Sequence, residues 1–314
     1  YMSVCNLYYT KIFLPKVNIK KIYFKIESII ELITSGIWNS LIHLGNILLQ
    51  GLNLLIANLF ISASAMGTLA LANTIPTVFS ALIGTVTQVF MPNYTILYAK
   101  RKTDELIMSI NSSMKILGLI TNIPIALLIA FGEEFFKLWV PGENAQILQW
   151  LSVLSISVFI VSGSINCLYN IFTVTNKVKM NAFVLIFTGI LNVPIVLILL
   201  NITNLDVFAI VLVSSILGIL RNLFFTIPYS AKYLGLKWYT FYPQVMKNIF
   251  AFIAILIIGF LFHLIWDINS WTSLVLISIV TATIGLLINL LLLFRWSELS
   301  RFFILIKQKL YKVK

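Results

Sequence analysis

The chain has 314 residues, of which 60% are hydrophobic and 10% are charged, and its net charge is +12 at pH 7. Soluble globular domains contain about 45–50% apolar and about 25% charged residues, so this composition excludes that class and also excludes intrinsic disorder. A basic balance on so apolar a chain is more typical of membrane proteins with basic loops than of nucleic-acid binding, and we expect no nucleic-acid partner.

Long uncharged segments follow a basic opening stretch, residues 1–33, which we interpret as a cytoplasmic linker. No Asp, Glu, Lys or Arg lies between Leu32 and Ala99, which leaves room for two membrane crossings of about 20 residues each, with a break near 61–64. Lipid offers the backbone no hydrogen-bond partners, so such spans must be helical. The sequence predicts an all-α integral membrane protein with eight transmembrane helices, at about 34–60, 65–97, 108–131, 147–174, 179–201, 206–229, 244–266 and 270–294.

Charged residues are distributed unequally between the two sides of these predicted helices. If helix 34–60 enters from the cytoplasm, the inner connections carry the Lys and Arg residues of 100–102, 177–179 and 232–247 and of the tail, 295–314. The outer connections carry one cation and five acids, namely Lys137, Glu133, Glu134, Glu143, Asp206 and Asp267. Basic loops face the cytoplasm in membrane proteins, so both ends of the chain are expected there. The tail is expected either to act as a basic anchor or to lie on the anionic inner leaflet.

Helix 34–60 carries polar residues at helical spacing. Ser35, Asn39, His43, Asn46, Gln50 and Asn53 recur every three or four residues, which places them on one helix face. Unsatisfied amides are costly in lipid, so this face must contact either other helices or water. Six polar groups favour the wall of a hydrated cavity over hydrogen bonding between helices alone. His43 is either a proton carrier or a structural histidine.

Two further helices repeat this pattern of polar residues. Helix 65–97 carries Asn73 and Gln88, with Thr77, Ser80 and Gly84 between them and a kink expected at Pro76. Helix 147–174 carries Asn166 and Asn170 with several serines, and small residues there fit close helix packing as well as a cavity wall. Helices 244–266 and 270–294 are almost wholly apolar. We therefore divide the spans into a six-helix unit, 34–229, and two accessory helices, 230–294.

Two cations lie deeper in the predicted spans than the loops. Arg221 and Lys115 are each placed toward the cytoplasmic side, where they could either extend to the headgroups or hold an anionic group such as a phosphate.

The sequence offers little chemistry for catalysis. The external acids are scattered, the two cysteines have no ligand-spaced neighbours, and no glycine-rich phosphate loop occurs, so we expect no metal, no cofactor and no enzymatic activity.

The segments Ser35–Phe60, Ala65–Pro76, Val89–Lys100 and Phe131–Gly142 resemble the second half of oligosaccharide flippases. These are the Wzx-type polysaccharide transporters of the multidrug, oligosaccharidyl-lipid and polysaccharide flippase superfamily, which is MATE-like in fold. The basic stretch KVNIKKIYFKIESIIELITSG, residues 16–36, is similar to the cytoplasmic bridge between the two lobes of such proteins.

This resemblance implies a transporter of the bacterial inner membrane. Its substrate would be an undecaprenyl-diphosphate-linked oligosaccharide repeat unit for O-antigen, capsule or exopolysaccharide synthesis, moved by alternating access. Arg221 and Lys115 would hold the diphosphate, and the asparagine face of helix 34–60 would line the sugar path. Polysaccharide polymerases and other assembly proteins are expected partners, besides the bilayer and the lipid-linked substrate.

The resemblance begins at the seventh of fourteen helices, so we expect either a fragment without the first lobe or a half-transporter that associates with itself. Two other functions stay open, a cation-coupled multidrug or metabolite antiporter of the same superfamily and a membrane polymerase or ligase.

Overall fold

The computed structural model describes residues 8–10, 12–13 and 25–294, so the predicted basic tail and the lysines at 11, 16, 20 and 21 lie outside the described residues. The chain divides into two compact units, Tyr1–Ser40 and Leu41–Lys314. The first unit holds the beginning of helix α2, Ile26–Asn46, and an aromatic group in which Tyr9 contacts Tyr8 and Phe13. The second unit holds the rest of the described chain.

Within the described residues, eight helical segments are long and apolar enough to cross a membrane. They run over Gly36–Phe60, Thr74–Ala99, Thr103–Trp139, Ala145–Val174, Val178–Ile202, Val207–Tyr233, Tyr242–Ile265 and Trp271–Leu293. The prediction of an all-α integral membrane protein with eight spans is therefore confirmed.

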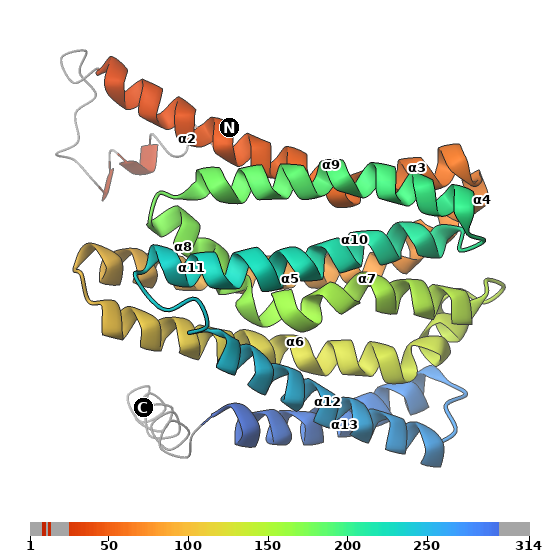
Figure 1. Cartoon of the computed structure of the whole chain (residues 1–314). Coiled ribbons are helices and arrows are strands. Elements are labelled where there is room, and N and C mark those ends of the chain that lie inside the picture. Colours follow the sequence, from red (N-terminus) through yellow and green to blue (C-terminus); the bar gives the residue numbers. More distant parts are fainter. Residues whose placement is uncertain (1–7, 11, 14–24, 295–314) are drawn as a thin grey trace. The chain divides into compact units, whose positions relative to one another are not determined.

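Several of these spans are built from more than one helical element (Figure 1). The elements after α2 are a π-helix, Ile47–Gly51, then α3 Asn53–Phe60, α4 Ala63–Ala72, α5 Thr74–Ala99, α6 Thr103–Trp139, α7 Ala145–Ile165, a 3₁₀ turn at Asn166–Leu168, α8 Tyr169–Val174, α9 Val178–Ile202, α10 Val207–Arg221, a second π-helix, Asn222–Thr226, α11 Ile227–Tyr233, α12 Tyr242–Ile265 and α13 Trp271–Leu293. Short connections join each span of the second unit to the next, so successive connections lie at opposite ends of the unit.

Helix α6 is the longest element and lies inside the second unit, where it contacts α5, α7, α12 and α13. Its 37 residues extend over about 55 Å, whereas the hydrocarbon core of a bilayer is about 30 Å thick. The helix therefore projects beyond the predicted span of 108–131 at both ends. Glu133, Glu134 and Lys137, which we expected in a connection, belong to its last turns, where Lys137 pairs with Glu133 at 2.7 Å.

The predicted helix 65–97 is interrupted rather than simply kinked. Helix α4 ends at Ala72, and α5 begins at Thr74, so the break lies at Asn73, three residues before Pro76. Proline has no N–H to donate to the carbonyl four residues earlier, and its ring crowds that carbonyl. The turn from Asn73 to Pro76 forms part of the wall of the cavity described below.

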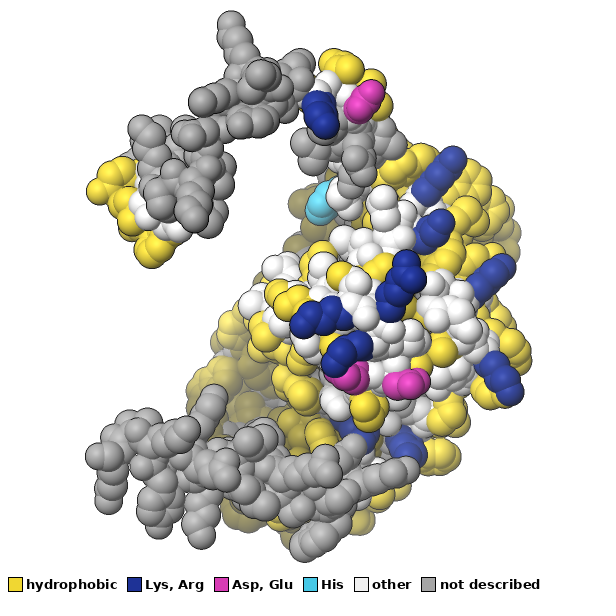
Figure 2. Space-filling view, turned by 90° about the vertical axis from the view of Figure 1, so that its left-hand side faces the viewer, with side chains coloured by type: hydrophobic (Ala, Val, Ile, Leu, Met, Phe, Trp, Pro, Cys, Tyr) yellow, Lys and Arg dark blue, Asp and Glu magenta, His cyan; other side chains and the backbone are white. Residues whose placement is uncertain are grey.

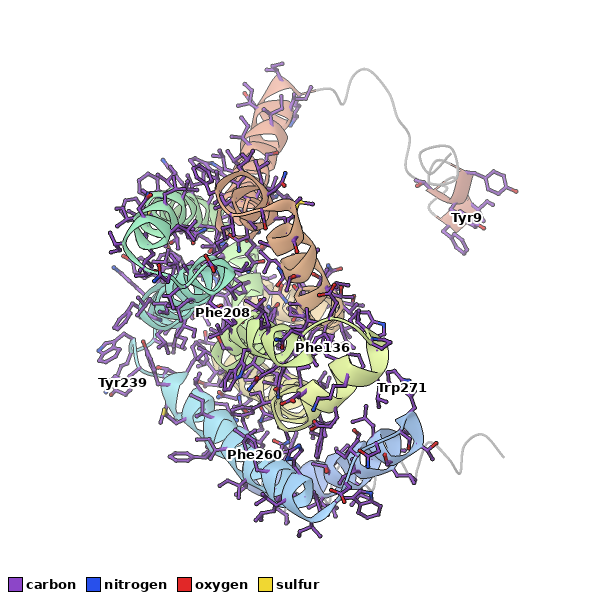
Figure 3. All side chains as sticks on the ribbon, turned by 90° about the vertical axis from the view of Figure 1, so that its right-hand side faces the viewer. Tyr9, Phe136, Phe208, Tyr239, Phe260 and Trp271 are labelled. Carbon is purple, nitrogen blue, oxygen red and sulfur yellow. The ribbon has the colours of Figure 1, made fainter. Side chains whose placement is uncertain are left out.

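Apolar side chains fill the interior of the second unit and also cover much of its outside. Phe136 of α6 is fully buried, whereas Phe260 of α12 is 46% exposed (Figure 3). Exposed Phe, Leu and Ile side chains on α9, α12 and α13 are what a lipid-facing surface requires, because the solvent there is hydrocarbon.

Lys and Arg side chains gather at one end of the second unit, as Figure 2 shows. This end holds the α5–α6, α8–α9 and α11–α12 connections, with Lys100, Arg101, Lys102, Lys177, Lys179, Lys232 and Lys237. The opposite end holds the acidic residues around 133–143, 206 and 267. The spans thus place the charges on two sides in the alternation that the sequence indicates.

Buried asparagines attach helices α12 and α13 to α6. Asn122 of α6 donates to the backbone carbonyl of Asn248 on α12 and to the side-chain oxygen of Asn289 on α13, at 3.1 Å each. All three asparagines are at most 1% exposed. A Cβ added at Gly118 would lie 2.3 Å from the Asn248 side-chain oxygen, so glycine is required there for the close approach of α6 and α12. Amides in an apolar interior hold these helices together.

Candidate functional site

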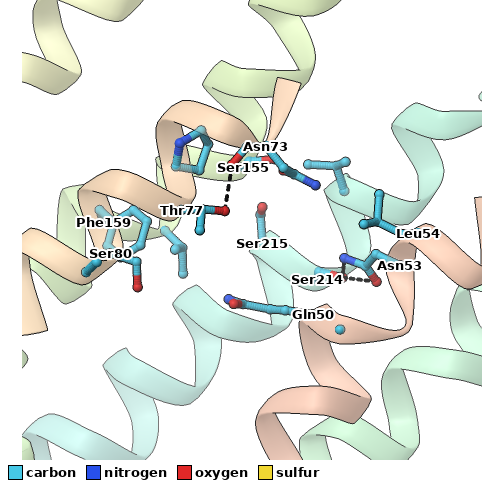
Figure 4. A pocket seen from close by; sticks show the side chains of 15 residues that line it. Gln50, Asn53, Leu54, Asn73, Thr77, Ser80, Ser155, Phe159, Ser214 and Ser215 are labelled. Atoms are coloured by element: carbon cyan, nitrogen blue, oxygen red, sulfur yellow. Dashed lines mark hydrogen bonds between the residues drawn. The ribbon is translucent and has the colours of Figure 1, made fainter. Parts of the chain in front are cut away.

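A polar cavity of about 480 Å³ opens between four spans of the second unit. Its polar lining comes from the first π-helix and α3, from α5 and the Asn73 break, from α7 and from α10 (Figure 4). These polar side chains are amides and hydroxyls, namely Gln50, Asn53, Asn73, Thr77, Ser80, Ser155, Ser214 and Ser215. The larger part of the exposed lining is apolar, and Leu54, Pro76, Ala81, Val158, Phe159 and Val211 contribute to it. None of the described residues that line the cavity is ionisable at neutral pH.

The break at Asn73 forms one wall of this cavity. Ser152 of α7 donates its hydroxyl to the backbone carbonyl of Ala72, at 2.6 Å. That carbonyl lies four residues before Pro76, so it is the one that loses its usual N–H donor. One turn further along α7, Ser155 donates to the Asn73 side-chain oxygen, at 2.8 Å. Ser152 therefore replaces the helical hydrogen bond that the proline removes, and Ser155 holds the side chain of Asn73 at the break.

The opposite wall is held by a network of amides and a hydroxyl. Asn53 donates to the Ser214 hydroxyl at 3.1 Å, and that hydroxyl is also 3.1 Å from the side-chain oxygen of Asn192 on α9. Asn192 in turn donates to the Leu49 carbonyl, which belongs to the first π-helix, at 3.2 Å. The network joins α3, α9 and α10 behind the cavity surface. π-Helical turns are rare in proteins, and those that occur often lie at functional sites.

Gln50, Asn53 and Asn73 are the residues predicted for a cavity that line this one. Thr77, Ser80 and Ser155, which follow the same sequence pattern, also line it. Ser214 and Ser215 were missed, because they are the only hydroxyl side chains of α10 and the other residues before Arg221 are apolar, so the helix shows no polar periodicity.

The remaining predicted cavity residues do not line this cavity. Asn39 lies in the first unit, where its side chain is exposed. In the second unit, His43, Asn46 and Gln88 are exposed on the surfaces of α2 and α5. Exposed polar side chains within apolar spans are costly against lipid, so they indicate a surface in contact with water or with other protein.

Asn166 and Asn170 lie at the irregular end of the α7–α8 span. Asn166 begins the 3₁₀ turn and is half-buried. Asn170 donates to the Thr87 carbonyl of α5 at 3.0 Å. Asn170 therefore forms a hydrogen bond between α8 and α5. This fits the second role that the sequence left open for the helix, which is close helix packing rather than a cavity wall.

Arg221 lies at the end of α10, directly before the second π-helix. Its guanidinium donates to the Tyr169 hydroxyl of α8 at 3.0 Å, and it also lies over that tyrosine ring. The Tyr169 hydroxyl donates to the side-chain oxygen of Asn222, which is fully buried. In the described part of the chain, Arg221 Nε and Asn222 Nδ2 are buried without a hydrogen-bond partner. These two hydrogen-bond donors without acceptors belong to consecutive residues.

Lys115 is half-buried on α6, and its amino group lies over the Phe294 ring at 5.6 Å from the ring centre. The lining of the polar cavity contains neither Lys115 nor Arg221. The two cations that we grouped together are thus placed on different helices outside the cavity.

One titratable pair was not anticipated from the sequence. His263 of α12 lies 2.9 Å from the Glu134 carboxylate of α6, at the acidic end of the second unit. No group of three or more His, Cys, Asp or Glu side chains able to hold a metal ion occurs among the described residues.

The amides and hydroxyls of the polar cavity can donate and accept hydrogen bonds, but its described lining offers no acid, base or nucleophilic thiol.

Comparison with known proteins gives one curated relative. The chain is 28% identical over 273 residues to a protein of Bacillus subtilis (strain 168) described as the uncharacterized membrane protein EpsK. This chain is a multi-pass membrane protein similar to EpsK. The alignment covers 87% of the chain and 54% of EpsK, so the chain spans about half the length of that relative. No protein-family model matches the chain, and no solved structure matches it significantly.

Proposed function

We propose that this chain belongs to a flippase of the bacterial inner membrane that moves lipid-linked oligosaccharide repeat units by alternating access. The observation that carries the proposal is the uncharged polar cavity between membrane spans. The proposal is also supported by the likeness to a bacterial membrane protein and by the sequence resemblance to Wzx-type transporters.

The chemistry of the cavity favours a neutral, hydroxyl-rich substrate. Serine, threonine and carboxamide side chains both donate and accept hydrogen bonds, as sugar hydroxyls do. Phe159 lines the same cavity and offers an aromatic face to the apolar side of a sugar ring. A site for a cationic drug would benefit from a buried carboxylate, and a site for chemistry would need an acid or base. The described lining provides neither, which favours transport of a glycan over both alternatives.

Arg221 is the better of our two candidates for the diphosphate of such a substrate. Its Nε group lacks an acceptor among the described residues, and a phosphate oxygen is an acceptor that suits a guanidinium. Both cations lie over an aromatic ring, but Arg221 belongs to α10, which lines the cavity, whereas Lys115 belongs to α6, which does not. We therefore assign Arg221 to the headgroup of the substrate and the cavity to its first sugars.

The exposed polar faces of α2 and α5 belong in this proposal to the aqueous pathway. The basic end of the second unit then faces the cytoplasm, in keeping with the positive-inside rule. We expect the lipid-linked oligosaccharide to be both substrate and partner, with polysaccharide polymerases acting on the exported units. No cofactor and no catalytic step is required.

The experiment is to delete the gene that carries this chain and to follow the lipid-linked repeat units. The proposal predicts that these units accumulate in the inner leaflet and that the intact gene restores export. A gene with Asn73→Leu and Gln50→Leu should restore membrane insertion but not export, whereas Thr283→Val, an exposed position on α13, is the matched control. Units that reach the outer leaflet but stay unpolymerised would identify an assembly enzyme instead. Normal polysaccharide with altered drug tolerance would identify an antiporter.

A further inference from the structure

A second cavity, of about 570 Å³, lies at the basic end of the second unit. It is formed by the α5–α6 connection, the first turn of α6 and the end of α11. Its lining consists of Tyr98, Ala99, Arg101, Lys102, Thr103, Leu106, Tyr233 and Leu234. It shares no residue with the polar cavity, so the inference below does not depend on the proposed function.

The backbone at this cavity is tightly defined. The N–H groups of Arg101 and Lys102 donate to the carbonyls of Tyr98 and Leu97, which closes the end of α5. Arg101 adopts a left-handed conformation, with φ of 56°, and residues other than glycine are uncommon there. Together with the two hydrogen bonds, this conformation forms the Schellman motif that commonly ends helices. The wall opposite is fixed because the Tyr233 ring packs edge-on against Phe172, at 5.8 Å between ring centres.

The electrostatics of the cavity favour an anion, and Arg101 is the main contributor. Lys102 is paired with Glu105 at 2.7 Å, so much of its charge is compensated, and Asp104 is exposed nearby in the first turn of α6. Arg101 is also exposed. Asp104 and Glu105 in the first turn of α6 offset the positive end of the helix dipole, so the field at the cavity comes mainly from Arg101.

The location of the cavity selects among anions. It lies at the ends of two spans, between Ala99 and Thr103, and the ends of apolar spans lie near the membrane–water interface. Tyr98 is 42% exposed at the same level, and tyrosines are enriched at that interface. Basic pockets between transmembrane helices bind anionic headgroups. We propose that this cavity binds the phosphate group of an anionic phospholipid, with Arg101 as its principal contact.

The experiment is native mass spectrometry of the purified protein with phosphatidylglycerol and phosphatidylcholine in competition. The protein should retain phosphatidylglycerol preferentially. Arg101→Gln should lower that retention about fivefold, the value for one cation near a membrane surface, and Lys102→Gln should lower it less because of Glu105. Glu105→Gln should raise retention by freeing Lys102. A rise cannot come from misfolding, which keeps the test valid if the other variants are unstable.

Lys177→Gln is the matched control, since Lys177 is exposed at the same end but outside the cavity, and its retention should match that of the native protein. Equal losses for Lys177→Gln and Arg101→Gln would show general charge attraction and overturn the proposal. Unchanged retention in both Arg101→Gln and Glu105→Gln would also overturn it. Displacement of the lipid by millimolar inorganic phosphate would assign the site to a soluble anion instead of a phospholipid.

Discussion

The carbonyl of Ala72 gives the sharpest stability prediction, because two residues far apart in sequence determine whether it has a donor. Pro76 removes the helical N–H, and Ser152 supplies a hydroxyl at 2.6 Å in its place. Ser152 is fully buried, so Ser152→Ala would leave the carbonyl without a donor and without water. Hydrogen bonds between membrane helices contribute about 0.6 kcal/mol on average and up to about 1.7 kcal/mol. We expect a loss near the upper value, about 1.5 kcal/mol, because nothing replaces the hydroxyl.

Pro76→Ala supplies the test of this reasoning, because an alanine at this position has an N–H that can donate to Ala72. The cost of Ser152→Ala should therefore fall by about 1 kcal/mol when Pro76→Ala is also present, which is a coupling that a double-mutant cycle measures. The assay is reversible unfolding of the purified protein in mixed detergent micelles. Ser157→Ala is the control, since its hydroxyl bonds within α7 to Leu154, and it should cost less than about 0.5 kcal/mol. An equal cost of Ser152→Ala in both backgrounds would refute the account of the break at Asn73.

Three further predictions concern the helix contacts and the orientation. Gly118→Val should destabilise the protein by about 1–3 kcal/mol, because the added Cβ meets the Asn248 side chain, whereas Gly84→Ala, with no atom within 4 Å, should be near neutral in the same unfolding assay. Asn122→Leu should weaken the packing of both α12 and α13 against α6, because both helices lose a hydrogen bond. Proteolysis of the α12–α13 connection at 266–270 should become faster, while cleavage of the α6–α7 connection should not change. Equal acceleration of both cleavages would contradict a local role. Cysteines placed at Asn176 and at Asn204 should be labelled by an impermeant reagent from opposite sides of the membrane, and labelling from one side would contradict the span order.

The eight spans could be predicted from the sequence because two independent physical signals agree there. Hydropathy sets the length of each span, and the charges at 100–102 and 177–179 mark the connections on one side. Neither signal reports helix ends beyond the lipid, which is why α6 extends past the prediction to Trp139. Neither signal locates a backbone break, although Pro76 indicated its neighbourhood.

The cavity could be predicted only in part, since periodicity identifies a face but not its partner. The polar face of helix 34–60 assumes a regular helix, whereas the π-helix at Ile47–Gly51 changes the helical repeat. Gln50 and Asn53 therefore reach the cavity, while His43 and Asn46 stay on the surface.

Single polar residues on apolar helices carried information that periodicity did not. Asn248 and Asn289 lie in largely apolar spans that show no polar face, and both are fully buried against α6. A lone amide in such a helix must find a hydrogen-bond partner, so it predicts a helix contact even where no polar face exists. The identity of the partner, Asn122, is set by the packing and could not be read from the spacing.

The most direct test of the central claim is a translocation assay in proteoliposomes with the intact gene product that carries this chain. A lipid-diphosphate-linked oligosaccharide with a quenchable label would be placed in one leaflet, and its appearance in the other would be followed. Transfer should be faster than in protein-free liposomes, should be much slower with Asn73→Leu and Gln50→Leu, and should keep its native rate with Thr283→Val. Transfer no faster than in protein-free liposomes, by protein that is folded and inserted, would contradict the claim that this chain belongs to a flippase.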